Sequence, residues 1–171
     1  MNELFCKNLP TKPIPGMGKI LVTGVSGYVG GHLVVELLAR GYQLRLMVRG
    51  DAEAYERRWP NAEIVVANAL DPEQVKTALR DIEAAYYLIH SLNMGPKRFE
   101  SADHQAALNF KDAAEENQVK RIIYLGGLGD VSSHLSHHLG SRIDTAINLI
   151  MGKVPVTTLR AAVIFGSGGS S

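Results

Sequence analysis

Three glycines at intervals of three residues follow a short apolar segment, and this arrangement can hold phosphate groups. Gly24, Gly27 and Gly30 permit a sharp turn, a close approach of the backbone to phosphate and tight packing of a helix on a strand. The helix N-terminus adds unpaired N–H groups and a partial positive charge. We therefore predict that a dinucleotide pyrophosphate binds here, a plain tight turn being the alternative. The predicted contacts are Gly24, Val25, Ser26, Gly27, Tyr28, Val29 and Gly30.

The residue after the second predicted strand distinguishes NAD sites from NADP sites. NAD sites carry Asp or Glu there for the ribose hydroxyls, whereas NADP sites place an arginine near the additional phosphate. Arg49 holds this position, and its guanidinium can pair with a phosphate. The alternatives are that Arg49 is a solvated charge and that Asp51 is a displaced acid. We expect NADP, with NAD as the alternative cofactor.

Alternating strands and helices are expected to position these residues. Gly41 can end the first helix, because glycine readily adopts the left-handed conformation. Asp71-Pro72 indicates the start of another helix, with Asp71 as the N-cap and Pro72 in the first turn. Such alternation predicts an α/β fold, a doubly wound parallel sheet of about six strands whose ligands bind at the carboxyl edge. We expect strands at 20–25, 43–48, 63–67, 84–89, 121–125 and 156–164, and helices at 28–40, 52–59, 71–80, 96–117 and 136–151.

Composition narrows the class of protein. The 171 residues suit one domain, and a net charge of +1 favours neither nucleic acid nor a membrane surface as a partner. Cys6 is the only cysteine, so an internal disulfide is excluded. No apolar segment is long enough to insert in a membrane, and residues 1–18 lack a secretory signal. We expect a cytoplasmic protein with a flexible leader at 1–18 and a Rossmann domain at 19–171.

Four segments carry a specific combination of residues: TGVSGYVG at 23–30, YYLIHSL at 86–92, KRIIYLGGLG at 120–129 and VTTLRAAVIFG at 156–166. Together they resemble the atypical short-chain dehydrogenase/reductases. The nearest subgroup is the NAD(P)H-binding, epimerase/dehydratase-like proteins related to the nucleotide-binding accessory subunit of respiratory complex I. Members usually continue for another hundred residues or more. The resemblance therefore implies a Rossmann domain truncated before its substrate-facing part.

The resemblance also implies further cofactor contacts. Asn68, with Ala69 and Leu70, stands where members carry an Asp that contacts the adenine amino group, and an Asn carbonyl oxygen can accept the same hydrogen bond. Ile89, His90 and Ser91 lie where members pass the ribose and phosphates. A packed histidine is the alternative for His90.

On the long helix we expect four polar residues to form mostly a solvated face: Asp103, His104, Asn109 and Lys111. Asn109 has two other interpretations. It matches an asparagine that lies near the cofactor in similar proteins, and it can equally serve in capping or packing.

The usual catalytic set of the larger family is absent. Catalytic members use a Tyr with a Lys four residues later and a Ser or Thr after strand five, whereas no tyrosine follows Tyr124 here and Gly126-Gly127 takes the place of the Ser. His138 and Arg142 have the spacing of the missing pair, so His138 is our candidate proton donor. A polar helix end is the alternative. His134, His137 and His138 lie close together in the sequence, but no carboxylate or cysteine lies at metal-ligand spacing from them. We therefore expect no metal site.

Two classes of function remain. The first is an NADP-dependent oxidoreductase that acts on an unknown small molecule, such as a quinone or a carbonyl compound. The second is a non-catalytic NADPH-binding redox sensor or accessory subunit. The absent tyrosine argues against a sugar-nucleotide epimerase or dehydratase. A homo-oligomer or a larger assembly is compatible with both classes.

Overall fold

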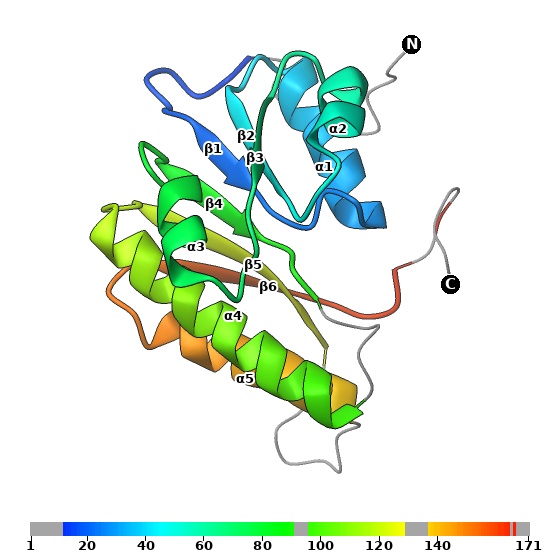
Figure 1. Ribbon diagram of the computed structural model, residues 1–171, viewed down its shortest axis with the longest axis vertical. Helices are drawn as coiled ribbons and strands as arrows, with labels where there is room; N and C mark the ends of the chain where they lie inside the picture. Colours follow the sequence, from blue (N-terminus) through cyan, green and yellow to red (C-terminus); the bar gives the residue numbers. More distant parts are fainter. Residues whose placement is uncertain (1–11, 91–95, 129–136, 165, 167–171) are drawn as a thin grey trace.

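The computed structural model describes residues 12–90, 96–128, 137–164 and 166, without the side chains of 96–100, 137 and 138. The described residues form six strands and five helices (Figure 1). The strands are β1 Ile20–Val22, β2 Leu44–Val48, β3 Glu63–Val66, β4 Ala84–Tyr87, β5 Arg121–Gly127 and β6 Val156–Ala161. The helices are α1 Tyr28–Ala39, α2 Ala52–Arg58, α3 Pro72–Ala78, α4 Pro96–Glu116 and α5 His137–Ile150.

The sheet has the order β3-β2-β1-β4-β5-β6, and all its neighbouring strands are parallel. Strand β1 lies in the middle, where Leu21 pairs with Arg45 on β2 and with Ala85 on β4. The chain builds outward in one direction from β1 to β3 and in the other from β4 to β6. This confirms the predicted doubly wound fold and places the switch in strand order between β1 and β4, where ligands of such sheets bind.

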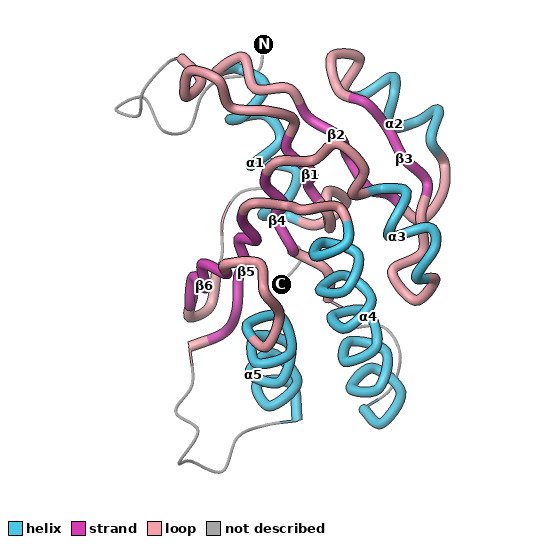
Figure 2. Tube along the Cα trace, turned by 90° about the vertical axis from the view of Figure 1, so that its left-hand side faces the viewer, coloured by secondary structure: helices cyan, strands magenta, loops and turns pink. Residues whose placement is uncertain are grey.

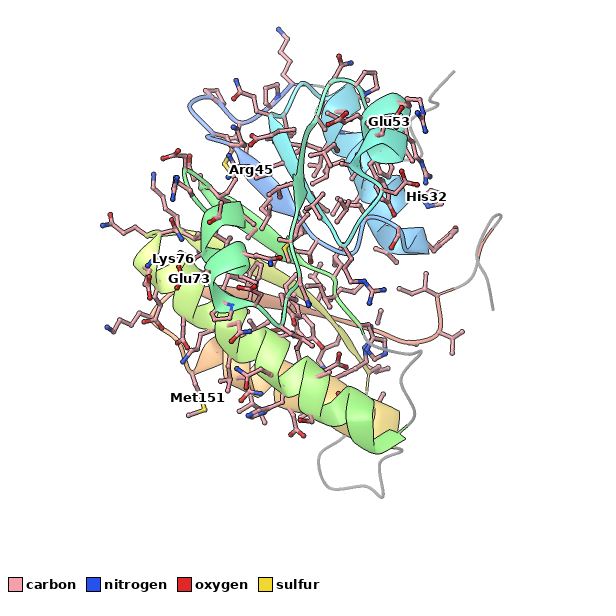
Figure 3. All side chains as sticks on the ribbon, in the orientation of Figure 1. His32, Arg45, Glu53, Glu73, Lys76 and Met151 are labelled. Atoms are coloured by element: carbon pink, nitrogen blue, oxygen red, sulfur yellow. The ribbon has the colours of Figure 1, made fainter. Side chains whose placement is uncertain are left out.

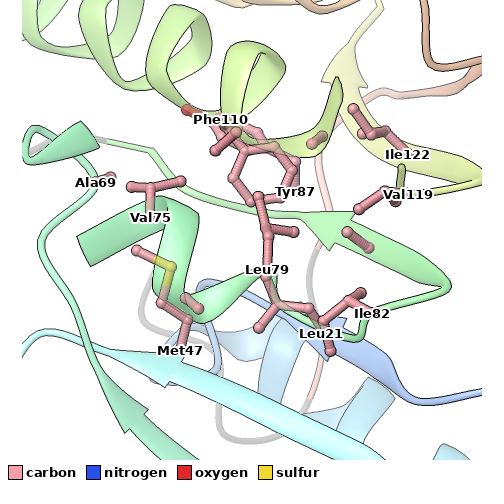
Figure 4. Packing of buried hydrophobic residues seen from close by; sticks show 14 of the residues in the cluster. Leu21, Met47, Ala69, Val75, Leu79, Ile82, Tyr87, Phe110, Val119 and Ile122 are labelled. Carbon is pink, nitrogen blue, oxygen red and sulfur yellow. The ribbon is translucent and has the colours of Figure 1, made fainter. Parts of the chain in front are cut away.

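The helices cover the two faces of the sheet in separate layers. Helices α1 and α2 pack over one face, where Val34, Leu37 and Trp59 join the inward residues of β1 and β2 in one core. Helices α3, α4 and α5 cover the other face, and Figure 2 shows α4 and α5 side by side. The core of that face includes Tyr87 and Phe110 (Figure 4). Their rings pack edge to face, with 4.9 Å between the ring centroids.

Strand ends differ from the predicted ranges at the carboxyl edge. Strand β1 ends at Val22 rather than at residue 25, because the chain turns at Gly24 with φ +65°. Strand β4 ends at Tyr87, since the Leu88 N–H donates to the Thr23 side chain. Strand β5 instead extends to Gly127, which pairs with Ala161 on β6. Pairing with a neighbour, rather than the apolar pattern, sets these ends.

The expected solvated face of α4 is wrong for Asp103, whereas the burial of Asn109 agrees with the packing role that was its alternative. Asp103 is 4% exposed and Asn109 is 7% exposed, whereas His104 is exposed. Helix α4 contacts both α3 and α5, so neighbours cover more of its circumference than one sheet face would. The periodicity of a single helix does not reveal this second partner.

A buried arginine ties strands β2 and β3 to the end of α3 (Figure 3). The Arg45 guanidinium donates to the Glu63 carboxylate at 2.8 Å and to the carbonyls of Ala78 and Arg80 at 3.0 and 2.6 Å. These bonds lie near the amino edge of the sheet and stabilise the end opposite the loops that follow β1, β2 and β3.

Residues 1–11 of the expected leader lie outside the described residues. Of the remainder, Met17 packs against the α1 side of the core, and the Gly18 N–H donates to the Glu83 carboxylate at 2.6 Å. Across the described ranges, we find no helix with the length and apolar character needed to cross a membrane.

Candidate functional site

The glycine-rich turn after β1 leaves no room for side chains at two positions. A Cβ on Gly24 would lie 2.8 Å from the Leu88 carbonyl carbon, and one on Gly30 would lie 2.8 Å from the Gly24 carbonyl carbon. The Gly27 N–H donates to the Gly24 carbonyl at 3.0 Å and closes the turn. The chain therefore passes from β1 into α1 within a tight loop at the carboxyl edge of the sheet.

The N-terminus of α1 has the features of an anion site. Gly27 is its N-cap residue, and within the described part of the chain the first turn has no side-chain cap hydrogen bond. Ser26 and Gly27 are exposed, while Tyr28 and Val29 are half-buried. Uncapped N–H groups and the positive end of the helix dipole are thus presented at an open loop, which suits a phosphate.

Thr23 joins the ends of β1 and β4. Its side chain is fully buried, and its hydroxyl donates to the Tyr86 carbonyl at 3.0 Å and accepts from the Leu88 N–H at 2.9 Å. Thr23 was not among the predicted cofactor contacts. Its position directly before the first glycine was the only available signal.

Arg49 and Asp51, which follow β2, differ in whether their side chains have a structural role. Arg49 is exposed directly after the strand. Asp51 adopts φ 50° and caps α2, where its side chain accepts a hydrogen bond from the Ala54 N–H at 3.2 Å. The Asp51 carboxylate is therefore already used in a helix cap, whereas the Arg49 guanidinium extends from the strand end.

The loop after β3 is held by side chains. The Asn68 side-chain oxygen accepts from the Leu70 N–H at 3.0 Å, and the Asn68 N–H donates to Gln74 at 2.9 Å. Asn109 on α4 donates its side-chain amide to the Ala69 carbonyl at 2.9 Å. Asn68 and Leu70 are exposed, while Ala69 is buried. Asn109 therefore packs against this loop and holds it beside the sheet edge.

The end of β4 brings His90 onto a buried carboxylate. Nδ1 of His90 lies 3.2 Å from Oδ2 of Asp103, and the same oxygen accepts a hydrogen bond from the Ser141 hydroxyl at 3.1 Å. Ile89 and His90 are half-buried, and Ser91 lies outside the described residues. Neither Asp103 nor Ser141 was singled out for this contact, because each is distant from His90 in sequence.

The candidate pair His138 and Arg142 is only partly described. The His138 side chain lies outside the described residues, although its backbone belongs to α5. Arg142 is half-buried, and its carbonyl accepts a hydrogen bond from the Tyr124 hydroxyl at 2.9 Å. The proton-donor role of His138 stays a prediction.

A hollow of about 190 Å³ lies between α5 and strands β5 and β6. Gly126 and Gly127 open it by lacking side chains, and Arg142 and Arg160 border it. Among the side chains that the structure describes, no group of three or more His, Cys, Asp or Glu residues could hold a metal ion.

Comparisons with known proteins agree on the class of this domain. A family model described as NAD(P)H-binding matches residues 24–152. The 3-beta-hydroxysteroid dehydrogenase of Mycolicibacterium neoaurum is 29% identical over 63% of this chain and 31% of its own length. The photosystem II assembly factor Ycf39 of Guillardia theta is 27% identical over 64% of this chain and 35% of its own. The chain spans about a third of the length of these curated relatives.

The fold also matches solved structures. The Bordetella bronchiseptica enzyme WbmG, in complex with NAD and UDP, superposes with a TM-score of 0.74 at 18% identity, over 86% of this chain and 54% of WbmG. At this identity the likeness concerns the fold. It agrees with the strand order and the layers described above.

Proposed function

Because the chain belongs to the NAD(P)H-binding family of atypical short-chain dehydrogenase/reductases, we propose that it is an NADP-dependent oxidoreductase acting on a small carbonyl compound or quinone. Bound NADPH would supply the hydride, and the protein would orient the reactants and stabilise charge. The relative named as a 3-beta-hydroxysteroid dehydrogenase is consistent with turnover.

The observation that carries the choice of NADP is the pair Arg49 and Asp51. NAD sites need an acid at the end of β2 for the ribose hydroxyls. Arg49 holds that position, and Asp51 is used in the cap of α2. An exposed guanidinium there favours the additional phosphate of NADP.

The remaining loops would hold the rest of the dinucleotide. The N-terminus of α1 would bind the pyrophosphate through the turn at 24–30. Asn68, with Ala69 and Leu70, would face the adenine, since the Asn68 oxygen has a second lone pair beyond the one used by Leu70. The chain after β4, through Ile89 and His90, would pass the ribose.

Calorimetric titration with NADPH and NADH tests the proposal. The wild-type protein should bind NADPH at least about 10-fold more tightly, because hydrogen bonds to a charged group contribute about 1.5–3 kcal/mol. Arg49→Ala should remove this preference and leave NADH binding unchanged. Arg80→Ala is the matched control, since Arg80 is an exposed arginine before β4, at the opposite edge. Equal binding of both cofactors by the wild-type protein would contradict the NADP assignment.

A non-catalytic NADPH-binding accessory protein or redox sensor is the second candidate. It is favoured by Gly126 and Gly127 in β5, where catalytic relatives place a Ser, and by the lack of a tyrosine after Tyr124. The relative named as an assembly factor fits this reading. NADPH consumption with added carbonyl compounds separates the two candidates, since a sensor would bind both redox forms with different affinity and consume none.

A further inference from the structure

A buried carboxylate lies behind the end of β4 and joins three elements. Asp103 of α4 is 4% exposed. Its Oδ2 lies 3.2 Å from Nδ1 of His90, in the chain after β4, and accepts a hydrogen bond from the Ser141 hydroxyl of α5. Burial of a charged carboxylate is costly unless hydrogen bonds and an opposite charge compensate it. His90 is a partner that can supply both.

This contact determines which nitrogen of His90 carries a proton. An ionised carboxylate only accepts hydrogen bonds, so Nδ1 of His90 donates to Asp103. The neutral ring then has its lone pair on Nε2, and the charged ring has a proton there. Asp–His pairs in enzymes use the carboxylate in this way to fix the tautomer and the orientation of the ring.

His90 also follows the carboxyl end of β4, close in the chain to the residue that packs against the glycine turn. Leu88 packs against the Gly24 turn, and His90 follows two residues later, within roughly 7 Å of chain. This is the switch point between β1 and β4, where ligands of doubly wound sheets bind. The His90 side chain is 15% exposed, so the ring is held but reaches the surface.

We propose that His90 is the proton-transfer residue of this oxidoreductase, in place of the missing tyrosine, and that Asp103 is its positioning residue. The inference rests on the proposed function. Bound NADPH would supply a hydride to the carbonyl carbon of the substrate and would leave as NADP⁺. The carbonyl oxygen receives the π electron pair and takes the proton from Nε2 of protonated His90. Solvent then returns a proton to His90, and the product is an alcohol.

Two tyrosines near Asp103, among the residues that the structure describes, do not supply this proton. Burial raises the pKa of Tyr87 on β4, and Asp103 raises it further. Burial likewise raises the pKa of Tyr124 on β5, although Arg142 of α5 opposes this. Both tyrosines therefore remain neutral around neutral pH.

The kinetic test uses NADPH consumption with benzaldehyde and phenanthrenequinone as probes. His90→Gln should lower kcat/KM by about 100-fold or more, since general acids contribute about 100- to 10,000-fold. Asp103→Asn should lower it less and displace the pH profile. Calorimetry with NADPH on both variants separates a loss of proton transfer, which lowers kcat at saturating NADPH, from a loss of cofactor binding through the chain after β4. The matched controls are His104→Gln and Asp112→Asn, which alter exposed residues of α4 outside the contact.

A second measurement does not depend on turnover. In nitrogen-detected NMR of histidine-labelled wild-type protein, the His90 ring should keep Nδ1 protonated across its titration. Its Nε2 resonance should shift when NADPH is added, whereas that of His104 should not. An Nδ1 that loses its proton, or an unmoved Nε2 resonance in protein that binds NADPH, would overturn the inference.

The outcomes separate the two proposals. A wild-type protein that binds neither dinucleotide overturns the proposed function together with the inference. A protein that binds NADPH but consumes none with either probe overturns the inference and leaves dinucleotide binding intact. Unchanged kcat/KM and pH profile in His90→Gln overturn the role of His90, while the oxidoreductase function stands.

Discussion

The Leu88 N–H donates a hydrogen bond of 2.9 Å to the Thr23 hydroxyl, and the two residues are 65 positions apart in the chain. The same hydroxyl donates to the Tyr86 carbonyl at 3.0 Å. The ends of β1 and β4 are thereby joined at the switch point of the sheet, directly before the Gly24 turn. The geometry of the candidate dinucleotide site depends on this junction.

Thr23→Val should destabilise the domain by about 1–3 kcal/mol, because the part-buried Leu88 N–H loses its acceptor while the shape of the side chain is kept. Thr23→Ser keeps the hydroxyl and should cost only about 1 kcal/mol for the lost methyl group. Urea denaturation followed by circular dichroism measures both values. A Val variant as stable as the Ser variant would show that the hydrogen bond contributes nothing.

Gly30→Ala should weaken NADPH binding and lower stability, because the new Cβ would lie 2.8 Å from the Gly24 carbonyl carbon and 3.0 Å from the Val25 Cα. Gly31→Ala is the matched control. Its Cβ would meet its nearest neighbours at 3.5 and 3.6 Å, and alanine in a helix is otherwise favoured over glycine by about 1 kcal/mol. Calorimetry and thermal denaturation compare the two, and equal effects would refute the close packing of α1 on the turn.

Asn109→Ala should weaken NADPH binding several-fold, because the loop at 68–70 loses the bond from Asn109 to the Ala69 carbonyl. A lost hydrogen bond of this kind contributes about 0.5–1.5 kcal/mol. Asn117→Ala serves for comparison, since Asn117 lies just beyond the same helix and donates to the Lys76 carbonyl, away from the loop. We expect Asn117→Ala to lower the stability of the domain and to leave its affinity for NADPH unchanged. If Asn117→Ala weakened NADPH binding and Asn109→Ala did not, the cofactor would have to bind away from the loop at 68–70.

The stability contributed by Glu63 should depend on pH. Burial raises the pKa of its carboxyl, but the hydrogen bonds from Lys19 and Arg45 outweigh burial and leave the pKa below its usual 4.5. A lowered folded-state pKa gives stability that is present above the unfolded value and is lost as the pH falls through the folded value. Glu63→Gln should thus cost about 1 kcal/mol at neutral pH and progressively less below 4.5.

Denaturation curves of wild type, Glu63→Gln and the exposed control Glu56→Gln, recorded between about pH 7 and about pH 3, test this. The difference between wild type and Glu63→Gln should shrink as the pH falls, while Glu56→Gln should follow wild type throughout. A constant difference would mean that the ion pairs of Glu63 do not contribute.

Local patterns of residues were enough to predict the fold class, the order of the elements and the position of the glycine turn. These features rest on local physics: the alternation of apolar segments and helical patterns, the conformational freedom of Gly24, and the cap at Asp71, whose side chain accepts from Glu73 and Gln74 as predicted. Each signal lies within a few residues of the structure that it specifies.

The contacts that support the site could not be predicted in the same way, because they join distant parts of the chain. Asp103 was expected on a mostly solvated face of the long helix, but α3 and α5 both pack against α4 and Asp103 is buried. The contacts of His90 with Asp103, of Asp103 with Ser141, and of Thr23 with Leu88 join residues 13, 38 and 65 positions apart. Such contacts depend on how whole layers pack, and no local pattern of residue types encodes them.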